Sequence, residues 1–442
     1  MNHLRYIAAA VASLISLMPA LASSLSVTSS STDKPIECEA PSSSGLRAVY
    51  VVNGVSGVNI VYTPSNSANQ VTWSRFSALG GGYAEPVTAG VTTEGSSSVL
   101  TAVEADMGYI VEEGSERTCF WVVDYALHPL DMHSLIEAAE EPDCSMTALV
   151  LEGSAPRLTY HDINGRQLTL SREMNLSYTI LEYNEETHVF TPVETSETLD
   201  DAEHTIHTPA PLCSTRFTLE GDRFLKVWGR PQSVTSPEVA AYAVDQRSWA
   251  TRQGEKAENE ISGGDDVTQL GGSAPAVVDF GAAVTEAAIF TEWQMSRSAD
   301  FDEITYRESQ PEFTYTFDEL GTTYVRFVCD NAAGKCQSVG QTYEVSIGES
   351  QLLCPNAFSP GVSEGVNDEW RVSYKSIIEF DCHIFNRWGQ KMATLTDPSQ
   401  GWDGRHGGKI VPAGVYYYVI KARGADGKKY NLSGDINIVG YE

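Results

Sequence analysis

The chain has 442 residues, with 59 acidic residues against 29 basic ones and a formal net charge of −30. This excess of negative charge is repelled by nucleic acid and by anionic membrane surfaces, so we exclude nucleic acid as a partner. The length exceeds what one hydrophobic core normally serves, and several domains are therefore expected.

The N-terminus predicts a secretory signal peptide over residues 1–22. Arg5 precedes the apolar run YIAAAVASLISLM, and the small-residue triplet Ala20-Leu21-Ala22 follows it, so cleavage is expected before Ser23. The run is too short for a permanent membrane span and no other apolar stretch of that length follows, so we expect no transmembrane segment. A buried N-terminal helix is the competing interpretation. The next stretch, SSLSVTSSSTDK, predicts a flexible leader over residues 23–35.

Short runs of alternating or continuous apolar residues, separated by Gly, Pro, Ser and Thr, predict an all-β protein. One segment, LDMHSLIEAAEE from Leu130 to Glu141, has helical spacing instead. The predicted strands are RAVYVVNG from Arg47, NQVTWSRF from Asn69, RTCFWVVDY from Arg117, RFLKVWG from Arg223 and TYVRFVCD from Thr323.

A glycine followed by an aromatic residue and an apolar run recurs at Gly108, Gly221 and Gly321. In immunoglobulin-like sandwiches an aromatic residue near the start of a late strand packs the corner between the sheets. We therefore predict tandem immunoglobulin-like β-sandwich modules followed by a C-terminal β-sandwich. The predicted limits are 36–137 and 138–250 for two immunoglobulin-like modules, 251–348 for an immunoglobulin-like or PKD-like module, and 349–442 for the last domain.

Eight cysteines form an even set, which in an exported chain favours disulfides over free thiols. Pairing neighbours in order would place one bridge in each of four segments. A zinc site is the alternative, although no CxxC pair occurs. The predicted bridges are Cys38 with Cys119, Cys144 with Cys213, Cys329 with Cys336, and Cys354 with Cys382.

No catalytic domain is predicted, because the chain has no P-loop and no HExxH. His128 and His133 flank Asp131 in HPLDMH, and His204 and His207 lie in HTIH, without the further ligands that a metal site needs. We expect no enzymatic activity and no cofactor. Calcium at adjacent carboxylates and a glycosidase-type carboxylate pair are the alternatives. The adjacent carboxylates are Asp200, Asp201, Asp265, Asp266, Asp300, Asp302 and Glu303.

The segment 351–442 differs from the rest of the chain in charge and pattern. It holds ten acidic and ten basic residues, so residues 1–350 carry the whole net charge. Every second residue from Phe380 to Ile384 is apolar, which predicts a strand with one buried face. Pro412-Ala413-Gly414 turns the chain into the strand former VYYYVIKA, and Asp426-Gly427 is a hairpin signal. A compact β-sandwich is expected here.

A series of motifs runs in order through this segment. They are Cys354-Pro355-Asn356-Ala357-Phe358-Ser359-Pro360, Gly365-Val366-Asn367-Asp368, Ile384-Phe385-Asn386-Arg387-Trp388-Gly389, Gly401-Trp402-Asp403-Gly404, Pro412-Ala413-Gly414-Val415-Tyr416 and Ser433-Gly434. Together they resemble the type B C-terminal sorting domain of the type IX secretion system, also called the gliding-motility-associated C-terminal domain of the Bacteroidota. The resemblance covers residues 352–442. One departure is Val362-Ser363-Glu364, where the family carries an Asn-Gly-Asp turn.

The resemblance implies that these motif residues build a shape that an export machine recognises. The implied sorting-motif residues are Asn356, Phe358, Pro360, Asn367, Asp368, Phe385, Asn386, Arg387, Trp388, Gly389, Trp402, Asp403, Gly404, Gly414, Tyr416 and Gly434. Among them Trp388, Trp402 and Tyr416, together with Tyr417 and Tyr418, suit a protein contact, although the same aromatic residues would also fill a sandwich core.

The resemblance also implies a route: the general export pathway to the periplasm, recognition by the type IX translocon, and transfer across the outer membrane. We therefore expect a non-enzymatic protein of the cell surface or outer membrane, a component or accessory of the type IX secretion or gliding machinery that contacts a PorP/SprF-type outer-membrane protein. An adhesin or other binding protein is the alternative, and a secreted hydrolase would require a catalytic domain with its own motif.

Overall fold

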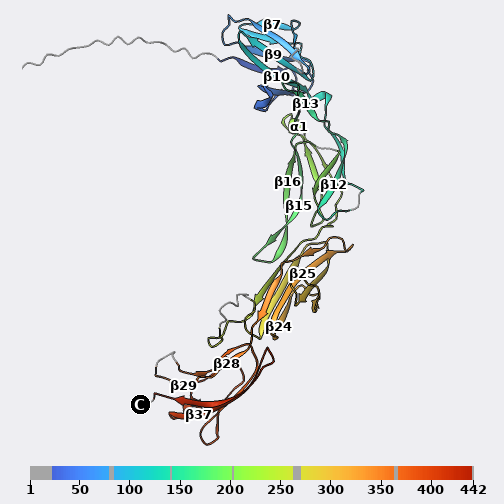
Figure 1. Cartoon of the computed structure of the whole chain (residues 1–442). Coiled ribbons are helices and arrows are strands. Elements are labelled where there is room, and N and C mark those ends of the chain that lie inside the picture. The colour runs from blue at the N-terminus through green and yellow to red at the C-terminus, as the bar shows by residue number, and fades with distance from the viewer. Residues whose placement is uncertain are drawn as a thin grey trace, which may run out of the picture.

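The computed structural model describes residues 22–78, 84–139, 142–201, 204–261, 270–362 and 367–440. Nearly all of the predicted signal peptide, the acidic pair Asp265 and Asp266, and the motif residues Gly365 and Val366 lie outside the described residues. The described part consists mainly of strands, whose sheets fall into four groups that follow one another along the chain and together form an arc (Figure 1). The predicted all-β fold of tandem β-sandwiches is confirmed.

The first group, at one end of the arc, is a sandwich of two sheets. Its strands are β1 (Ser24–Ser29), β2 (Ile36–Glu39), β3 (Ala48–Val52), β4 (Val58–Thr63), β5 (Val71–Phe76), β6 (Glu85–Pro86), β7 (Val91–Glu94), β8 (Ser97–Leu100), β9 (Met107–Glu113) and β10 (Glu116–Asp124), with 3₁₀ turns η1 (Ser42–Ser44) and η2 (Tyr125–Leu127). The strand orders are β1-β4-β8-β7 and β2-β3-β10-β9-β5-β6.

Strand β1 occupies residues that were predicted as part of a flexible leader, so that prediction is wrong. All six residues of β1 pair with β4, from Ser24 opposite Thr63 to Ser29 opposite Val58. Leu25 is buried and Val27 packs against the same core, while Ser24 and Ser26 are exposed. Serine-rich stretches are typical of linkers, but these exposed serines lie on the outer face of an edge strand.

The second group contains the helix α1 (Arg223–Val227) beside its sheets. Its strands are β11 (Asp131–Glu137), β12 (Met146–Ser154), β13 (Leu158–His161), β14 (Gln167–Leu170), β15 (Met174–Asn184), β16 (Val189–Leu199), β17 (Thr205–Pro209), β18 (Thr218–Gly221) and β19 (Gln232–Thr235). The sheet orders are β11-β12-β17, β13-β14 and β16-β15-β18-β19.

Two predicted elements of this group are wrong. Residues predicted as helical from Leu130 form strand β11, in which a β-bulge between Met132 and Ser134 shifts the alternation. Met132 and Leu135 therefore both face the core at a spacing of three, which imitates a helix. Conversely, the predicted strand RFLKVWG forms α1, because the Asp222 side chain accepts a hydrogen bond from the Leu225 amide and caps the helix.

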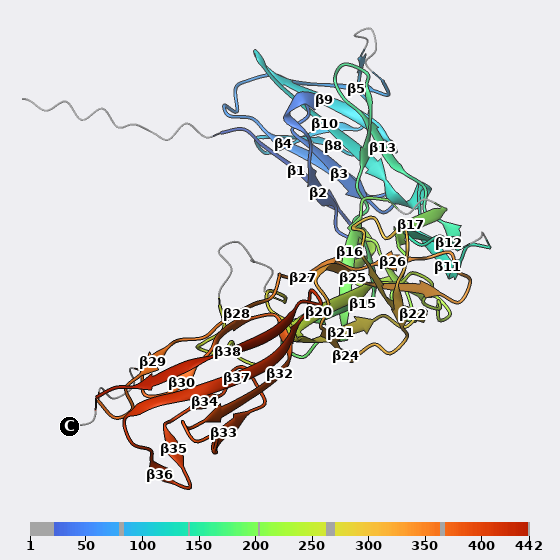
Figure 2. The same ribbon diagram turned by 60° about the horizontal axis from the view of Figure 1, so that its bottom comes forward.

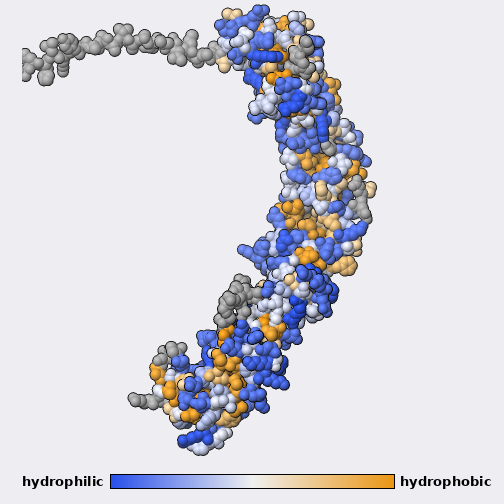
Figure 3. All heavy atoms as spheres, viewed as in Figure 1, coloured by the Kyte–Doolittle hydropathy of each residue, from blue (hydrophilic) through white to orange (hydrophobic). Residues whose placement is uncertain are grey.

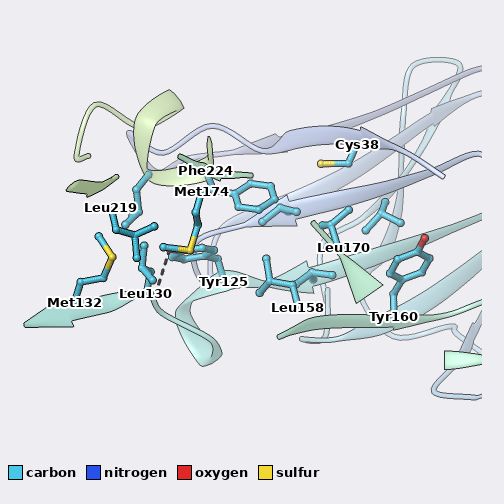
Figure 4. Packing of buried hydrophobic residues seen from close by; sticks show 14 of the residues in the cluster. Cys38, Tyr125, Leu130, Met132, Leu158, Tyr160, Leu170, Met174, Leu219 and Phe224 are labelled. Carbon is cyan, nitrogen blue, oxygen red and sulfur yellow. Dashed lines mark hydrogen bonds between the residues drawn. The ribbon is translucent and has the colours of Figure 1, made fainter. Parts of the chain in front are cut away.

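One hydrophobic core joins the first two groups. In the fully buried strand β3, Ala48, Tyr50 and Val52 face the core of the first sandwich, whereas Val49 and Val51 face a second core. That second core extends through β12, β15 and β18 to α1. Figure 4 shows part of it, with Cys38 from the first group near residues of the second. The continuous apolar run in RAVYVV thus reflects a strand that is covered on both faces.

The third group is a two-sheet sandwich. Its strands are β20 (Gln246–Arg252), β21 (Ala276–Val284), β22 (Ala288–Ser296), β23 (Tyr306–Glu308), β24 (Phe313–Phe317), β25 (Gly321–Asn331), β26 (Ser338–Val339) and β27 (Tyr343–Ile347). One sheet has the order β20-β21-β24, and the other has the order β23-β22-β25-β26 with β27 also paired to β25. Trp293 is fully buried at the centre of its aromatic core.

The fourth group lies at the C-terminal end of the arc, and its largest sheet is seen most clearly in Figure 2. Its strands are β28 (Gln351–Leu353), β29 (Ala357–Phe358), β30 (Trp370–Arg371), β31 (Ser373–Lys375), β32 (Ile377–Phe385), β33 (Lys391–Leu395), β34 (Gly401–Trp402), β35 (Arg405–His406), β36 (Lys409–Ile410), β37 (Gly414–Gly424) and β38 (Lys429–Ile438). The largest sheet has the order β29-β38-β37-β32-β33. The predicted hairpin is confirmed, since β37 and β38 pair around Asp426 and Gly427.

The strand pairing bears on where one domain ends and the next begins. β11 precedes residue 138 but pairs with β12, and β20 begins before residue 251 but pairs with β21. The limits predicted from the sequence stay predictions, and we propose that the second and third domains begin near residues 130 and 245.

The structure contains a disulfide between Cys144 and Cys336, with Cα atoms 5.4 Å apart, which joins the second and third groups. The in-order bridges of Cys144 with Cys213 and of Cys329 with Cys336 are therefore wrong. Cys213 turns toward the Thr179 carbonyl instead, and Cys329 is buried in the aromatic core of the third group. The free thiols are Cys38, Cys119, Cys213, Cys329, Cys354 and Cys382.

The bridge predicted between Cys38 and Cys119 is absent because of the strand order. Cys38 lies opposite Val49, and β10 pairs with β3 on the other side, with Trp121 opposite the same valine. Two strands that flank a third are roughly 10 Å apart, which exceeds the reach of a disulfide. The remaining predicted bridge is also absent: Cys354 and Cys382 both pack in the core of the fourth group, as free thiols.

Candidate functional site

The C-terminal motif residues divide into a buried set and an exposed set. Phe358, Trp402 and Tyr416 are 3%, 3% and 7% exposed and pack in series, with ring centres 5.5 Å and 5.2 Å apart. Trp402 Nε1 donates to the Arg405 carbonyl at 3.0 Å, and the Tyr416 hydroxyl donates to the Pro412 carbonyl at 2.9 Å. These aromatic residues build the core, so they are not available for a contact with another protein.

Two motif glycines are required by close packing. Gly404 has a φ of 72°, and a Cβ there would lie 3.2 Å from Pro360 Cγ and 3.3 Å from Phe358 Cζ. A Cβ on Gly434 would lie 2.7 Å from the Tyr418 hydroxyl oxygen. Both positions therefore favour glycine because of contacts inside the domain.

The polar motif residues near β29 and β34 hold turns. The Asn356 carbonyl accepts hydrogen bonds from the backbone and side chain of Asn437, at 2.9 Å and 3.0 Å. Asp368 accepts from the Gly361 amide at 2.9 Å, and Asp403 accepts from the Arg405 amide at 3.0 Å. Asn367 adopts a φ of 54°, and Gly414 one of 148°.

The two large exposed side chains of the motif, Arg387 and Trp388, lie in the turn between β32 and β33, which follows Phe385. Asn386 Oδ1 accepts the backbone N–H groups of Trp388 and Gln390, both at 3.0 Å, and Gly389 takes a φ of 79°. These bonds form a local turn that needs no cover from the rest of the domain. Trp388 is 75% exposed, and the Arg387 guanidinium lies 4.2 Å from the centre of its ring.

Beside this turn lies a groove of about 440 Å³, which we call the Trp388 groove. It is bounded by the turn, the β35–β36 hairpin and the loop that leads into β37, all at the tip of the domain that Figure 2 shows around β35 and β36. The lining residues are Asn386, Arg387, Trp388, Gln390, Met392, His406, Lys409, Ile410, Val411, Pro412, Ala413, Gly414, Val415 and Tyr416.

Sequence reasoning found the Trp388 side of the groove and missed the other side. Ile410 and Val415 are 47% and 44% exposed, and His406 Nδ1 donates to the Met392 carbonyl at 3.0 Å. The glycine pair in RHGGKI is a two-residue hairpin signal that could have placed Lys409 beside the motif.

Two of the candidate histidines each lie beside a single aspartate. His128 pairs with Asp106 at 2.8 Å, and His133 pairs with Asp131 at 3.1 Å. No three His, Cys, Asp or Glu side chains of the described residues come together as metal ligands. Burial raises the pKa of the Cys382 thiol to about 12, so this thiol is not a ready nucleophile at neutral pH.

Within the described ranges, no helix has the length and apolar character needed to cross a membrane. Figure 3 shows apolar residues gathered near the middle of the arc and over parts of the C-terminal group, among many hydrophilic ones.

Comparison with known families gives two matches in different parts of the chain. Residues 136–236 match the fibronectin type III domain family, in agreement with the sandwich of the second group. Residues 352–438 match the type IX secretion signal domain family. No curated protein matches the chain.

Solved structures resemble the chain only distantly. A tetra-tandem repeat from the extending region of a large adhesion protein has 11% identity and a TM-score of 0.23, over 95% of this chain and 100% of that one. Immunoglobulin domains 1–5 of Sidekick-1 have 13% identity and a TM-score of 0.25, over 86% and 75%. Dimeric latent PorU from Porphyromonas gingivalis has 10% identity and a TM-score of 0.16, over 73% and 35%. Scores this low do not establish a shared fold.

The family match covers every exposed and buried motif residue described above, in a domain whose core and turns those residues build. Such a domain marks a protein for export to the cell surface or beyond. Residues 352–438, at the C-terminal end of this sequence, are a type IX secretion signal domain.

Proposed function

We propose that this chain is a non-enzymatic surface protein, held at the outer membrane through its C-terminal domain as a component or accessory of the type IX secretion or gliding machinery. The observation that carries the proposal is the exposed turn of the sorting motif, which holds Arg387 and Trp388. A tryptophan that is 75% exposed contributes little to the stability of its own domain, whereas tryptophan and arginine are the residues that most often dominate protein interfaces. The proposed partners are the type IX translocon and a PorP/SprF-type outer-membrane protein.

The remainder of the chain supports a structural role, because its groups are joined firmly. The disulfide links the second and third groups, and His188 stacks on Trp249 with ring centres 4.0 Å apart at the same junction. At the next junction, the Asn259 side chain donates to the carbonyls of Val372 and Pro398 at 2.7 Å and 2.8 Å. An arc with bonded junctions can hold its acidic N-terminal part away from the C-terminal domain.

The test is surface display of the full chain in cells that carry the type IX machinery. Protease accessibility on intact cells should fall for Trp388→Ala, while the periplasmic pool of folded protein should rise. Val419→Ala is the matched control, since Val419 is 42% exposed on the outer face of β37 and lies outside the groove. Unchanged display of the Trp388 variant would remove the support that the groove gives to the proposal.

Purification of the tagged chain from detergent-solubilised outer membrane should also recover a PorP/SprF-type protein. Recovery of the chain free in the culture medium, without such a partner, would contradict a machine component and favour secreted cargo.

An adhesin is the second candidate. Firmly joined tandem sandwiches favour it, because such an arc would project its far end away from the cell surface. The two candidates differ in the phenotype of a deletion strain. Loss of a machine component should reduce the export of other type IX substrates, whereas loss of an adhesin should reduce attachment and leave that export unchanged.

A further inference from the structure

The charge of the Trp388 groove is opposite to that of the chain as a whole. Its lining includes Arg387, Lys409 and His406 and no aspartate or glutamate, although the sequence has 59 acidic residues and only 29 basic ones. A cationic groove attracts anionic groups, whereas the acidic residues 1–350, which carry the net negative charge, repel them.

The cations of this groove also lack internal carboxylate partners. Elsewhere in the same domain Arg405 pairs with Asp403 at 3.5 Å, and Arg371 pairs with Glu369 at 2.9 Å. By contrast, no ion pair joins Arg387 or Lys409 to any described residue, and Arg387 instead lies over the exposed Trp388 ring. A guanidinium held over an aromatic ring keeps its N–H donors free for a carboxylate.

The apolar part of the groove restricts the anion further. Trp388, Ile410 and Val415 present 75%, 47% and 44% of their surfaces to solvent around the same groove, which Met392 also lines. A free phosphate would satisfy the cations and leave this apolar surface wet. A peptide that combines carboxylates with apolar side chains would cover both.

We propose that the Trp388 groove binds an acidic peptide segment with interspersed apolar side chains, supplied by a protein partner of the export or anchoring step. This deepens the function proposed above and rests on it. The carboxylates of the segment meet Arg387 and Lys409, and its apolar side chains pack against Trp388 and Ile410. Binding of this kind weakens with salt, because the charged contacts are open to solvent.

The test uses the full chain, with a photo-crosslinking phenylalanine analogue in place of Trp388 in one variant and in place of Tyr417 in the control. Tyr417 is 45% exposed on the same strand as Val415 but does not line the groove. After irradiation of cells, the crosslinked peptide is identified by mass spectrometry. The expected product of the groove variant is a peptide of another protein that is rich in Asp and Glu and contains apolar residues, and this product should be absent from the control.

A charge-reversed variant supplies the second arm. Arg387→Glu combined with Lys409→Glu should lower the yield of that product about tenfold or more, because like charges then face each other across the contact. Lys421→Glu combined with Lys429→Glu, two exposed lysines of β37 and β38 outside the groove, should leave the yield within about twofold.

Each other outcome would overturn the proposal. A crosslink to a basic or uncharged peptide, to a second copy of this chain, to lipopolysaccharide or to lipid would show a different occupant. A chain with the analogue at position 388 that still reaches the surface and forms no crosslink would refute the inference and leave the proposed export function standing. Surface display that survives removal of the whole C-terminal domain would instead refute the proposed function.

Discussion

Replacing Arg172 with methionine should loosen the junction between the first two sheet groups. The Arg172 side chain is fully buried and pairs through Nη1 with the buried carboxylate of Asp222. Its Nε and Nη2 atoms donate to the Pro156 carbonyl at 2.9 Å and 2.7 Å, and Nη2 also donates to the His128 carbonyl at 2.6 Å. The Tyr125 hydroxyl donates to the same carboxylate at 3.0 Å.

The magnitude follows from what the substitution leaves behind. Removing one member of a buried ion pair costs about 3–5 kcal/mol, because the remaining charge stays buried without its partner. Here Asp222 keeps the hydrogen bonds from Tyr125 and from the Leu225 amide, which limits the cost, whereas the carbonyls of Pro156 and His128 lose their donors. We expect Arg172→Met to lower the free energy of unfolding of this region by about 3–4 kcal/mol.

Hydrogen exchange is the suitable assay, because a chain of several domains does not unfold in one step. Amides of β15, β18 and α1 should exchange about two to three orders of magnitude faster in Arg172→Met. Adding Asp222→Asn should restore part of the protection, since the amide oxygen still caps α1 and the buried negative charge is gone.

Arg297→Met is the control, because Arg297 and Glu319 form an exposed pair worth about 1 kcal/mol or less. The view that Arg172 stabilises the junction would be refuted if exchange in Arg172→Met stayed within about threefold of the wild-type rate or matched this control.

Three further outcomes are expected. Glu113→Gln should lower the free energy of unfolding by about 1.5–3 kcal/mol, because the carboxylate accepts hydrogen bonds from Ser65 and Asn69 in the turn after β4. These hydrogen bonds lower the pKa of Glu113 from 4.5 to about 2. The stabilisation is therefore present above pH 4.5 and should be lost as the pH falls toward 2, which acid titration of the tryptophan fluorescence would measure. Non-reducing peptide mapping should find Cys144 linked to Cys336, and Cys144→Ser should lower stability by up to about 5 kcal/mol in the chain-entropy model; a link of Cys144 to any other cysteine would contradict the structure. Gly434→Ala should destabilise the C-terminal domain by about 1–3 kcal/mol through its clash with Tyr418 and reduce surface display, and unchanged thermal unfolding of that domain would count against this packing.

Regular local patterns allowed much of the fold to be predicted. Strands β10 and β25 and the β37–β38 hairpin lie where apolar runs and turn residues indicated them. The predictions failed where one residue changed the pattern: the bulge in β11 shifts the alternation, and the Asp222 cap turns an apolar run into a helix. Each effect depends on one local feature, a bulge or a capping side chain, that periodicity does not reveal.

The cysteine pairing depended on information of a different kind. Whether Cys144 meets Cys213 or Cys336 is decided by how the second and third groups pack end to end, across a separation of 192 residues. Strand order likewise separates Cys38 from Cys119, although the sequence makes them neighbours in the series of cysteines. Counting cysteines can therefore indicate that bridges form but not which ones.

The C-terminal site shows the same limit. Trp388 and Trp402 each precede a turn glycine, at Gly389 and Gly404, so their local signals are alike and the family motif contains both. Trp402 is covered by Phe358 and Tyr416, which come from distant strands of the domain, while the turn that carries Trp388 closes on its own hydrogen bonds and leaves the ring in water. Local sequence determines the turn, but the side chains that other strands pack against a residue decide whether that residue is buried. This packing is what separates a core residue from a docking residue.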